Sequence, residues 1–298
     1  MLTLCSSRLR VEIAEPGERP NCGFRFDRSG FISEVILDGT VRFCASEPSN
    51  LAHPSSGGRG LCSEIQMDFG EDYEAALPYP KFGGGIIPNS DGSRYCFYRK
   101  YGAAEEFPVT VKAGENQAVF HTQAVSCRGY ALEENKTVTV EENRITVDYQ
   151  MKNTGDKELR LREYVHNFLS VDGMALSPAY HLELPSLPDL GTEPIKTPRG
   201  QECNFCGEGH GLTFQKADVA EAMFEAAKTD TDETLPFRWK LSHDGAKAWV
   251  AGEDWFVPSA VTVWAVDHMV SPEIFHAVCL QPGESASWKR SWSFEAER

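Results

Sequence analysis

The fold is decided by residues 136–173, KTVTVEENRITVDYQMKNTGDKELRLREYVHNFLSVDG. Polar and apolar residues alternate along Lys136–Val140 and again along Ile145–Met151, which is the pattern of strands with one buried face. Turn-forming residues separate these segments, and a third apolar segment begins at Leu159. The stretch therefore predicts an antiparallel meander of three strands.

The third predicted strand carries a candidate proton-transfer group. His166 is followed by an amide, Asn167, and an aromatic residue, Phe168. A rigid strand can hold such a histidine in a fixed orientation. A single histidine in a strand is more often a packed side chain with one hydrogen bond, so on His166 alone this alternative stays open.

Short alternating segments bounded by turns continue along most of the chain. The strongest local signal is Asp38-Gly39 between two such segments, which is typical of a hairpin. We predict a single all-β domain over residues 1–298, built as a large antiparallel β-sandwich. The Ala- and Glu-rich segment Ala217–Lys228 is the exception and could form a short helix. Further strands are expected at 31–37, 40–43, 109–111, 118–122, 260–266, 274–278 and 287–294.

Composition limits the possible functions. The chain has 298 residues, 41% of them hydrophobic, and a net charge of −15. That charge disfavours binding to nucleic acid and to anionic membranes. No apolar run approaches the roughly 20 residues of a membrane span, and the N-terminal residues do not resemble a signal peptide. A soluble cytoplasmic protein is expected.

Motifs for metal and nucleotide chemistry lack their required context. Cys203 and Cys206 form a C-x-x-C with His210 nearby, but the second ligand pair of a zinc site is missing. The chain contains neither a dinucleotide-binding nor a P-loop glycine motif, and no G-x-S-x-G. We therefore expect no metal and no cofactor.

A second candidate residue is Glu273, in the segment Val270–Phe275. It directly follows Pro272, at the mouth of an apolar segment. Because proline cannot donate a ladder hydrogen bond, Pro272 is expected at a strand start or a sheet edge. A half-buried carboxylate there can have a raised pKa and act as a base, whereas the alternative is a solvated glutamate at a strand end.

Together these segments resemble the aldose 1-epimerase family of the galactose mutarotase-like superfamily, and in particular an uncharacterised epimerase-like branch. In that family a catalytic histidine lies on a strand, and a catalytic carboxylate follows about a hundred residues later. His166 and Glu273 match these positions. The other matching segments are 153–155, 60–64, 72–74, 81–83 and the ending 280–284 with Trp288 and Phe294.

The resemblance implies a mutarotase, an isomerase that interconverts the anomers of a small sugar without metal or cofactor. Glu273 would be the base at the anomeric hydroxyl, and His166 the acid at the ring oxygen. The family's arginine motif is not found, so Lys81 is the expected replacement. The remaining candidates for substrate binding are Glu64, Tyr73, Asn167 and Trp264, although core packing is the favoured interpretation for Trp264.

Two other functions remain open. The missing arginine motif favours a catalytically silent carbohydrate-binding protein on the same fold, whereas the presence of both His166 and Glu273 favours the enzyme. A polysaccharide lyase is disfavoured by the negative charge. For the enzyme, the functional atoms of the pair should lie roughly 5–8 Å apart, and Asn167 should face the opposite side of its strand. The sugar and the oligomeric state are not predicted.

Overall fold

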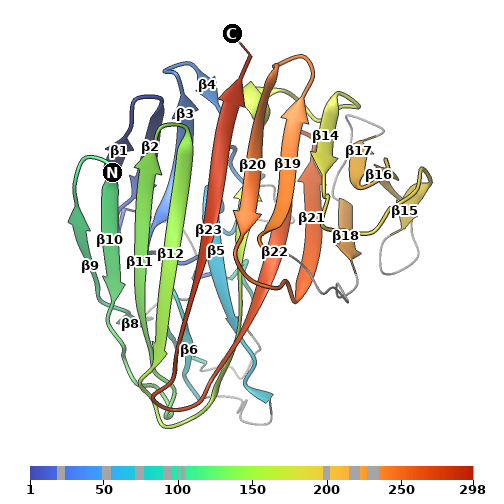
Figure 1. The fold of residues 1–298 in the computed structure, drawn as a ribbon. Helices are drawn as coiled ribbons and strands as arrows, with labels where there is room; N and C mark the ends of the chain where they lie inside the picture. Colours follow the sequence, from blue (N-terminus) through green and yellow to red (C-terminus); the bar gives the residue numbers. More distant parts are fainter. Residues whose placement is uncertain are drawn as a thin grey trace.

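Two large antiparallel sheets face each other in the computed structural model, with a small third sheet at one end (Figure 1). The residues described are 1–18, 24–48, 55–70, 77–89, 95–99, 101, 105–196, 202–214, 222–226 and 235–297. Over these ranges there is no α-helix, and no helical segment has the length and hydrophobicity needed to cross a membrane. The prediction of a large all-β antiparallel sandwich is confirmed.

The nine-stranded sheet has the order β1-β2-β3-β5-β13-β22-β21-β18, with β4 paired to β3. Its central strands β5, β13 and β22 come from segments far apart in the chain. A short 3₁₀ turn, η2 (Val171–Gly173), follows β13. The strands are β1 (Leu2–Cys5), β2 (Leu9–Ala14), β3 (Phe31–Leu37), β4 (Val41–Arg42), β5 (Gly60–Met67), β13 (Leu159–Phe168), β18 (Ala222–Ala226), β21 (Ala260–Val266) and β22 (Met269–Leu280).

The eleven-stranded sheet has the order β15-β16-β17-β14-β19-β20-β23-β12-β11-β10-β9. Its strands are β9 (Val109–Ala113), β10 (Gln117–Thr122), β11 (Leu132–Glu141), β12 (Arg144–Asn153), β14 (Tyr180–Glu183), β15 (Pro194–Lys196), β16 (Glu202–Gly207), β17 (Gly211–Phe214), β19 (Phe237–His243), β20 (Ala248–Asp254) and β23 (Ser285–Ala296). The small sheet pairs β6 (Tyr79–Lys81), β7 (Gly85–Ile87) and β8 (Glu105–Glu106).

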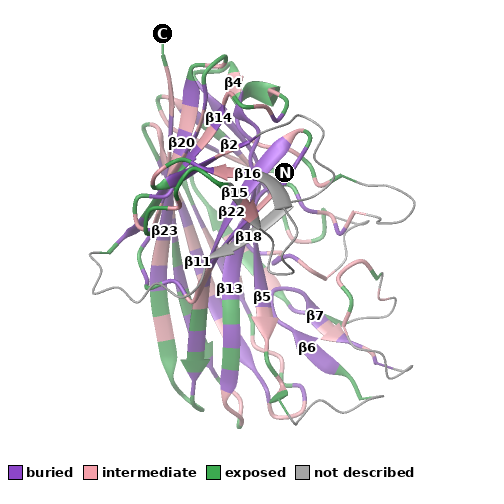
Figure 2. Cartoon of the chain, turned by 90° about the vertical axis from the view of Figure 1, so that its right-hand side faces the viewer, coloured by how far each residue is buried: buried purple, intermediate pink, exposed green. Residues whose placement is uncertain are grey.

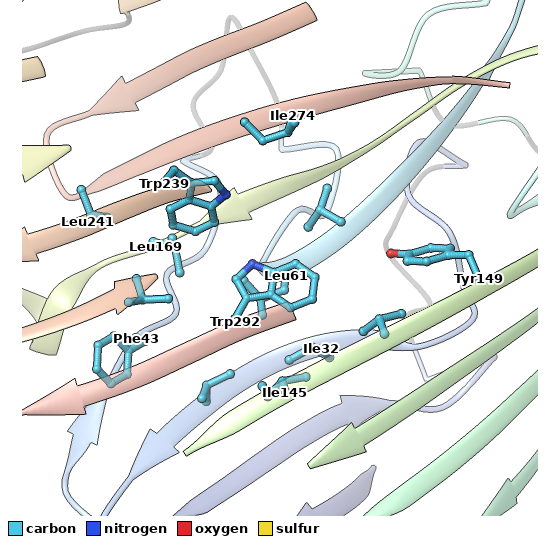
Figure 3. Close-up of a cluster of buried hydrophobic side chains, with 14 of the residues drawn as sticks. Ile32, Phe43, Leu61, Ile145, Tyr149, Leu169, Trp239, Leu241, Ile274 and Trp292 are labelled. Atoms are coloured by element: carbon cyan, nitrogen blue, oxygen red, sulfur yellow. The ribbon is translucent and has the colours of Figure 1, made fainter. Parts of the chain in front are cut away.

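The main hydrophobic core fills the space between the two large sheets. Leu61, Leu169 and Ile274 of one sheet region face Ile145 and Trp292 of the other (Figure 3). A second, smaller apolar cluster lies on the outer face of the nine-stranded sheet, away from the eleven-stranded one, and includes Phe26, Cys62 and Phe168. The central strands of this sheet are therefore buried on both faces, as the continuous purple along part of β13 shows (Figure 2).

The predicted meander is correct for two strands and wrong for the third. β11 and β12 pair as a hairpin, but β13 crosses into the other sheet, where it lies between β5 and β22. The second half of β13 is buried at every position, whereas β12 alternates. A strand without a solvated face needs cover on both sides. The core shared with the eleven-stranded sheet covers one face of β13, and the smaller apolar cluster covers the other.

Two other local predictions are corrected. Residues 222–226, inside the segment expected to form a helix, are a strand paired with β21, so tertiary pairing overrides helix propensity. Pro272 lies inside β22 rather than at a strand start or a sheet edge. The rest of the expected helix, residues 217–221 and 227–228, lies outside the described residues.

Candidate active site

The ladder between β13 and β22 opens in the middle of the sheet. It pairs Leu159–Glu163 with His276–Leu280, and it resumes only at the isolated bridge between Leu169 and Val270. The register is the same on both sides of this opening, so His166 lies directly opposite Glu273. The missing N–H of Pro272 is tolerated next to an interrupted ladder. The opening thus accounts for the proline and for the meeting of the two candidate residues.

His166, Glu273 and Ser271 form one hydrogen-bonded group on the outer face of the sheet. His166 Nε2 lies 3.1 Å from Glu273 Oε1. Ser271 Oγ lies 2.8 Å from His166 Nδ1 and donates to Glu273 Oε1 at 3.2 Å. If Nδ1–H donates to Ser271, the other ring nitrogen faces Glu273 as an acceptor. Ser271 therefore orients both members of the pair.

Aromatic rings surround the histidine. Its imidazole stacks on Phe168, with centroids 3.9 Å apart, and Trp264 and Phe26 approach it edge-on at 5.3 and 6.1 Å. Gly58 lets the covering segment come close, because a Cβ there would lie 2.3 Å from the Phe168 ring. This cover removes water from around the pair and lowers the local polarity.

Burial sets the charge state of the pair. It raises the pKa of Glu273 to about 8. It also lowers the pKa of His166 well below its usual range, and the nearby Arg25 charge lowers it further. Both directions favour the neutral forms. In the neutral forms the carboxyl proton belongs to Glu273, and it faces the unprotonated His166 Nε2 across a 3.1 Å contact.

A second group of charged residues adjoins the pair on the same face. Arg25 donates to Glu64 Oε2 at 3.0 Å and to the Tyr164 hydroxyl at 3.1 Å, and Lys81 Nζ lies 3.4 Å from Glu64 Oε1. Burial acts to raise the pKa of Glu64, but the Lys81 and Arg25 charges outweigh it and lower that pKa. Burial lowers the pKa of Lys81. Glu64 is therefore held as an anion between two cations.

The predicted site residues are partly brought together. Glu64 lies one outward step along β5 from the position opposite His166, Lys81 contacts Glu64, and half-buried Trp264 contacts the histidine ring. Asn167 faces the opposite side of its strand, as expected from alternation. There it accepts from Trp292 Nε1 at 3.0 Å and donates to the Pro272 carbonyl, which turns it away from the pair and from the expected role in substrate binding. Because successive strand residues alternate faces, Asn167 lies on the inner face of the sheet, where its side chain bridges β13 and β22 across the opening.

The structure corrects one further expectation, and two others concern residues that it describes only in part. The 3.1 Å contact between His166 and Glu273 is shorter than the 5–8 Å expected. The expected value came from enzymes whose carboxyl groups stand on either side of a glycosidic bond, whereas both oxygens of mutarotation are bonded to one carbon. Tyr73 and the side chain of Cys203 lie outside the described residues. Within the described part of the chain no cluster of His, Cys, Asp and Glu could hold a metal ion.

Sequence reasoning missed Arg25 and assigned no role to Ser271. Arg25 lies in a loop before β3, in Phe24-Arg25-Phe26, and only the tertiary fold brings it to Tyr164. A cation between two aromatic residues was the available signal. Ser271 stands two residues before Glu273, so the alternation of strand residues places both on one face. That spacing was visible in the sequence.

Comparison with known proteins gives structural but not sequence matches. No protein-family model matches the chain, and no curated protein matches it. A galactose mutarotase related enzyme from Lactobacillus acidophilus superposes with a TM-score of 0.59 at 13% identity, covering 99% of this chain and 97% of that one. A galactose mutarotase-like protein from Lactobacillus casei gives 0.60 at 13%, covering 99% and 100%. The GalM/aldose epimerase homologue from C. elegans gives 0.55 at 10%, covering 100% and 99%.

These matches run over nearly the whole of each chain and establish the fold. The expected resemblance is confirmed: the protein has a galactose mutarotase-like sandwich, and proteins described as mutarotase-like or aldose epimerase homologues are among its structural neighbours. At 10–13% identity they do not carry an activity over to this chain.

Proposed function

We propose that the protein is an aldose 1-epimerase-like isomerase, which interconverts sugar anomers by acid–base ring opening. One observation carries the proposal: His166 and Glu273 meet where the ladder opens, where they are buried and in contact. Buried titratable pairs with displaced pKa values are typical of catalytic sites. The reaction requires one group that gives a proton and one that takes a proton.

The acid and base roles follow from which residue carries the proton before the reaction. Ring opening removes a proton from the anomeric hydroxyl and adds one to the ring oxygen, and both oxygens are bonded to the anomeric carbon. With the proton on Glu273 in the empty site, Glu273 protonates the ring oxygen and His166 accepts from the hydroxyl. The resemblance implies the opposite starting roles. After rotation of the aldehyde, ring closure reverses the roles and returns the proton.

Neighbouring residues support this reaction. Ser271 keeps the imidazole oriented through Nδ1. Half-buried Trp264 offers an aromatic surface next to the imidazole, suited to packing on a sugar ring. Arg25 adds a positive charge near the pair, which opposes protonation of His166 and keeps the imidazole neutral in the empty site.

A screen of free sugars tests the proposal. Anomer exchange is followed by polarimetry or by NMR, with freshly dissolved aldohexoses and aldopentoses as substrates. We expect at least one sugar to exchange faster with protein, and His166→Ala to remove about 10²-fold or more of the acceleration. A correctly folded wild-type protein that accelerates no sugar would overturn the proposal.

The second candidate is a catalytically silent carbohydrate-binding protein. The burial of the pair favours this candidate, because His166 is only 4% and Glu273 only 6% exposed. The same screen separates the two functions. A binding protein shows sugar-dependent NMR shifts or calorimetric heats without any change in anomer exchange.

A further inference from the structure

The outer face of the nine-stranded sheet continues beyond the His166–Glu273 pair. Along β13 the outward side chains change from buried Tyr164 to exposed Arg162, and the exposed positions are visible along that half of the strand (Figure 2). Along β5 the outward positions after the partner of His166 are Glu64 and then half-buried Gln66. A surface thus leads from the pair toward solvent.

A cavity of about 380 Å³ lies on this surface. One wall is the outward row Glu64, Gln66 and Asp68, and the described lining does not include the catalytic pair. Its volume is in the range of small-ligand sites, about 300–1,000 Å³. Successive outward residues of a strand are about 7 Å apart. The near end of the cavity, at Glu64, is therefore one such step along the strand from the position opposite His166.

Other residues of the cavity lining are aromatic. Tyr79, Tyr95 and Phe97 line the cavity, and they are braced by other side chains. Tyr95 stacks on Tyr101, and the Arg25 guanidinium lies 4.3 Å from the Phe97 ring centroid. The Tyr95 hydroxyl is buried and has no hydrogen-bond partner among the described residues. Since a buried hydroxyl without a partner costs free energy, a ligand that bonds to it would be stabilised.

Rings also occupy the outward positions of β13 and β22 next to the pair. Tyr164 and Phe275 stack with centroids 4.4 Å apart. Arg162 lies over Phe275 and donates to Gln66 Oε1 at 2.9 Å. Flat rings next to fixed hydrogen-bonding groups suit a ligand with apolar faces and hydroxyl edges, and sugar rings have both.

We propose that this cavity binds the second ring of a reducing oligosaccharide whose reducing-end ring lies against His166 and Glu273. The inference rests on the proposed function for the position of the first ring. It names the substrate class as a sugar that extends beyond one ring, and it assigns the cavity to recognition. Tyr95 and Phe97 are the specificity-determining residues, and neither takes part in the proton transfers.

Binding is measured by NMR titration and calorimetry with maltose, cellobiose and lactose, against glucose and galactose. We expect at least one disaccharide to bind about threefold to tenfold more tightly than the single rings, the effect of one aromatic contact or one hydrogen bond. Tyr95→Phe and Phe97→Ala should each reduce this preference and leave single-ring affinity within about twofold. Trp255→Ala, an exposed aromatic beside β20 of the other sheet, is the matched control.

The outcomes separate the two proposals. Equal affinity for one and two rings, absence of disaccharide binding, or a preference that both cavity variants retain would overturn the cavity assignment. If disaccharides bind and the variants weaken them while no sugar exchanges faster, the assignment stands and the isomerase proposal fails. Circular dichroism of each variant confirms that the protein is folded.

Discussion

The two buried polar clusters on either side of β13 differ in how their charges are balanced. On the inner face Glu163 accepts from Arg290, which also binds Asp254 and the Ile274 carbonyl. On the outer face, three residues along the strand, His166 meets Glu273. Both clusters are almost fully buried. The inner cluster joins β13 to β23 and β20 of the facing sheet, and the outer one joins β13 to β22 beside it. Their positions alone would not show which cluster stabilises the fold and which takes part in a reaction.

The difference lies in which protons can move. An arginine side chain stays protonated in proteins, so the charge at the centre of the inner cluster is fixed. In the outer pair burial shifts both pKa values in the direction that favours the neutral forms, so the carboxyl proton of Glu273 faces an imidazole nitrogen that can accept it. A buried group held by a permanent charge cross-links the two sheets, whereas a buried pair of neutral groups can exchange a proton with a ligand.

The inner cluster also has unsatisfied atoms. Glu163 Oε1 and Arg290 Nε are buried without a hydrogen-bond partner among the described residues, and burial raises the pKa of Asp254 to about 6. Such a cluster is a modest source of stability when intact, but breaking it leaves uncompensated charge. Substituting one member of each cluster in turn tests whether the inner cluster acts on stability and the outer pair on catalysis.

The largest expected effect is on stability, from Arg290→Met. Removing the cation leaves Glu163 and Asp254 buried without their partner, and the free energy of unfolding should fall by about 3–5 kcal/mol. Urea denaturation measures it. Lys240→Ala, at an exposed pair with Glu183, is the control and should change stability by about 1 kcal/mol or less. A loss for Arg290→Met no larger than the control would contradict a structural role for the inner cluster.

Glu273→Gln should affect catalysis more than folding. It keeps the shape of the side chain but removes the proton donor, so anomer exchange should fall by about 10²-fold or more, close to 3 kcal/mol of transition-state stabilisation. Glu163→Gln is the matched variant on the inner face. It should lower stability and leave the exchange rate per folded molecule nearly unchanged. Equal rate losses in the two variants would remove the distinction between the faces.

The pH dependence of stability should identify the outer pair. The folded-state pKa of Glu273 is raised to about 8, so its contribution is complete below its unfolded pKa and is lost as pH rises toward 8. The lowered pKa of His166 gives the opposite slope below its ordinary value of about 6.5. The two slopes oppose each other below about pH 6.5, and only the Glu273 slope remains above that.

Between about pH 6.5 and 8 the wild-type protein should therefore lose about 2 kcal/mol that Glu273→Gln does not lose. Denaturant unfolding at half-unit pH steps measures the difference between the two proteins. Taking the difference removes the titration of other buried groups, such as Glu134, whose pKa burial also raises to about 8. Parallel stability curves for the two proteins would show that Glu273 is ionised throughout.

The smallest expected effect comes from Ser271→Ala. The serine touches His166 Nδ1 and Glu273 Oε1, and losing it should slow exchange about tenfold, the size of one or two buried hydrogen bonds. The pH optimum of exchange should shift as well, which a packing defect alone would not cause. Ser271→Thr keeps the hydroxyl and should restore most of the rate. Failure of that rescue, with the protein folded, would argue against a positioning role.

Much of the fold could be predicted because the sheets follow local alternation. The alternation of polar and apolar residues along Lys136–Val140 and Ile145–Met151 predicts the two strands that pair as the β11–β12 hairpin. The crossing of β13 could not be predicted, because a strand buried on both faces has no alternation to show which sheet it joins. The same tertiary choice decides which strand lies opposite His166.

The candidate site could likewise be predicted only in part. His166 and Glu273 were proposed from short motifs, and the fold places them in contact. Arg25 reaches the site from a loop that no local pattern connects with β13. Asn167 looked like a ligand-binding amide in the sequence, but strand alternation turns it toward Trp292. Residue types indicated the chemistry, and only the pairing of distant strands showed which of them meet.

The constant register across the opening makes the site sensitive to chain length. Five residues intervene on each strand, 164–168 on β13 and 271–275 on β22, between the last ladder pair and the isolated bridge. Inserting or deleting one residue on either strand would turn every later side chain to the other face. Substitutions around this pair keep its two members opposite each other, whereas a change in chain length keeps them opposite only if it falls in the loops.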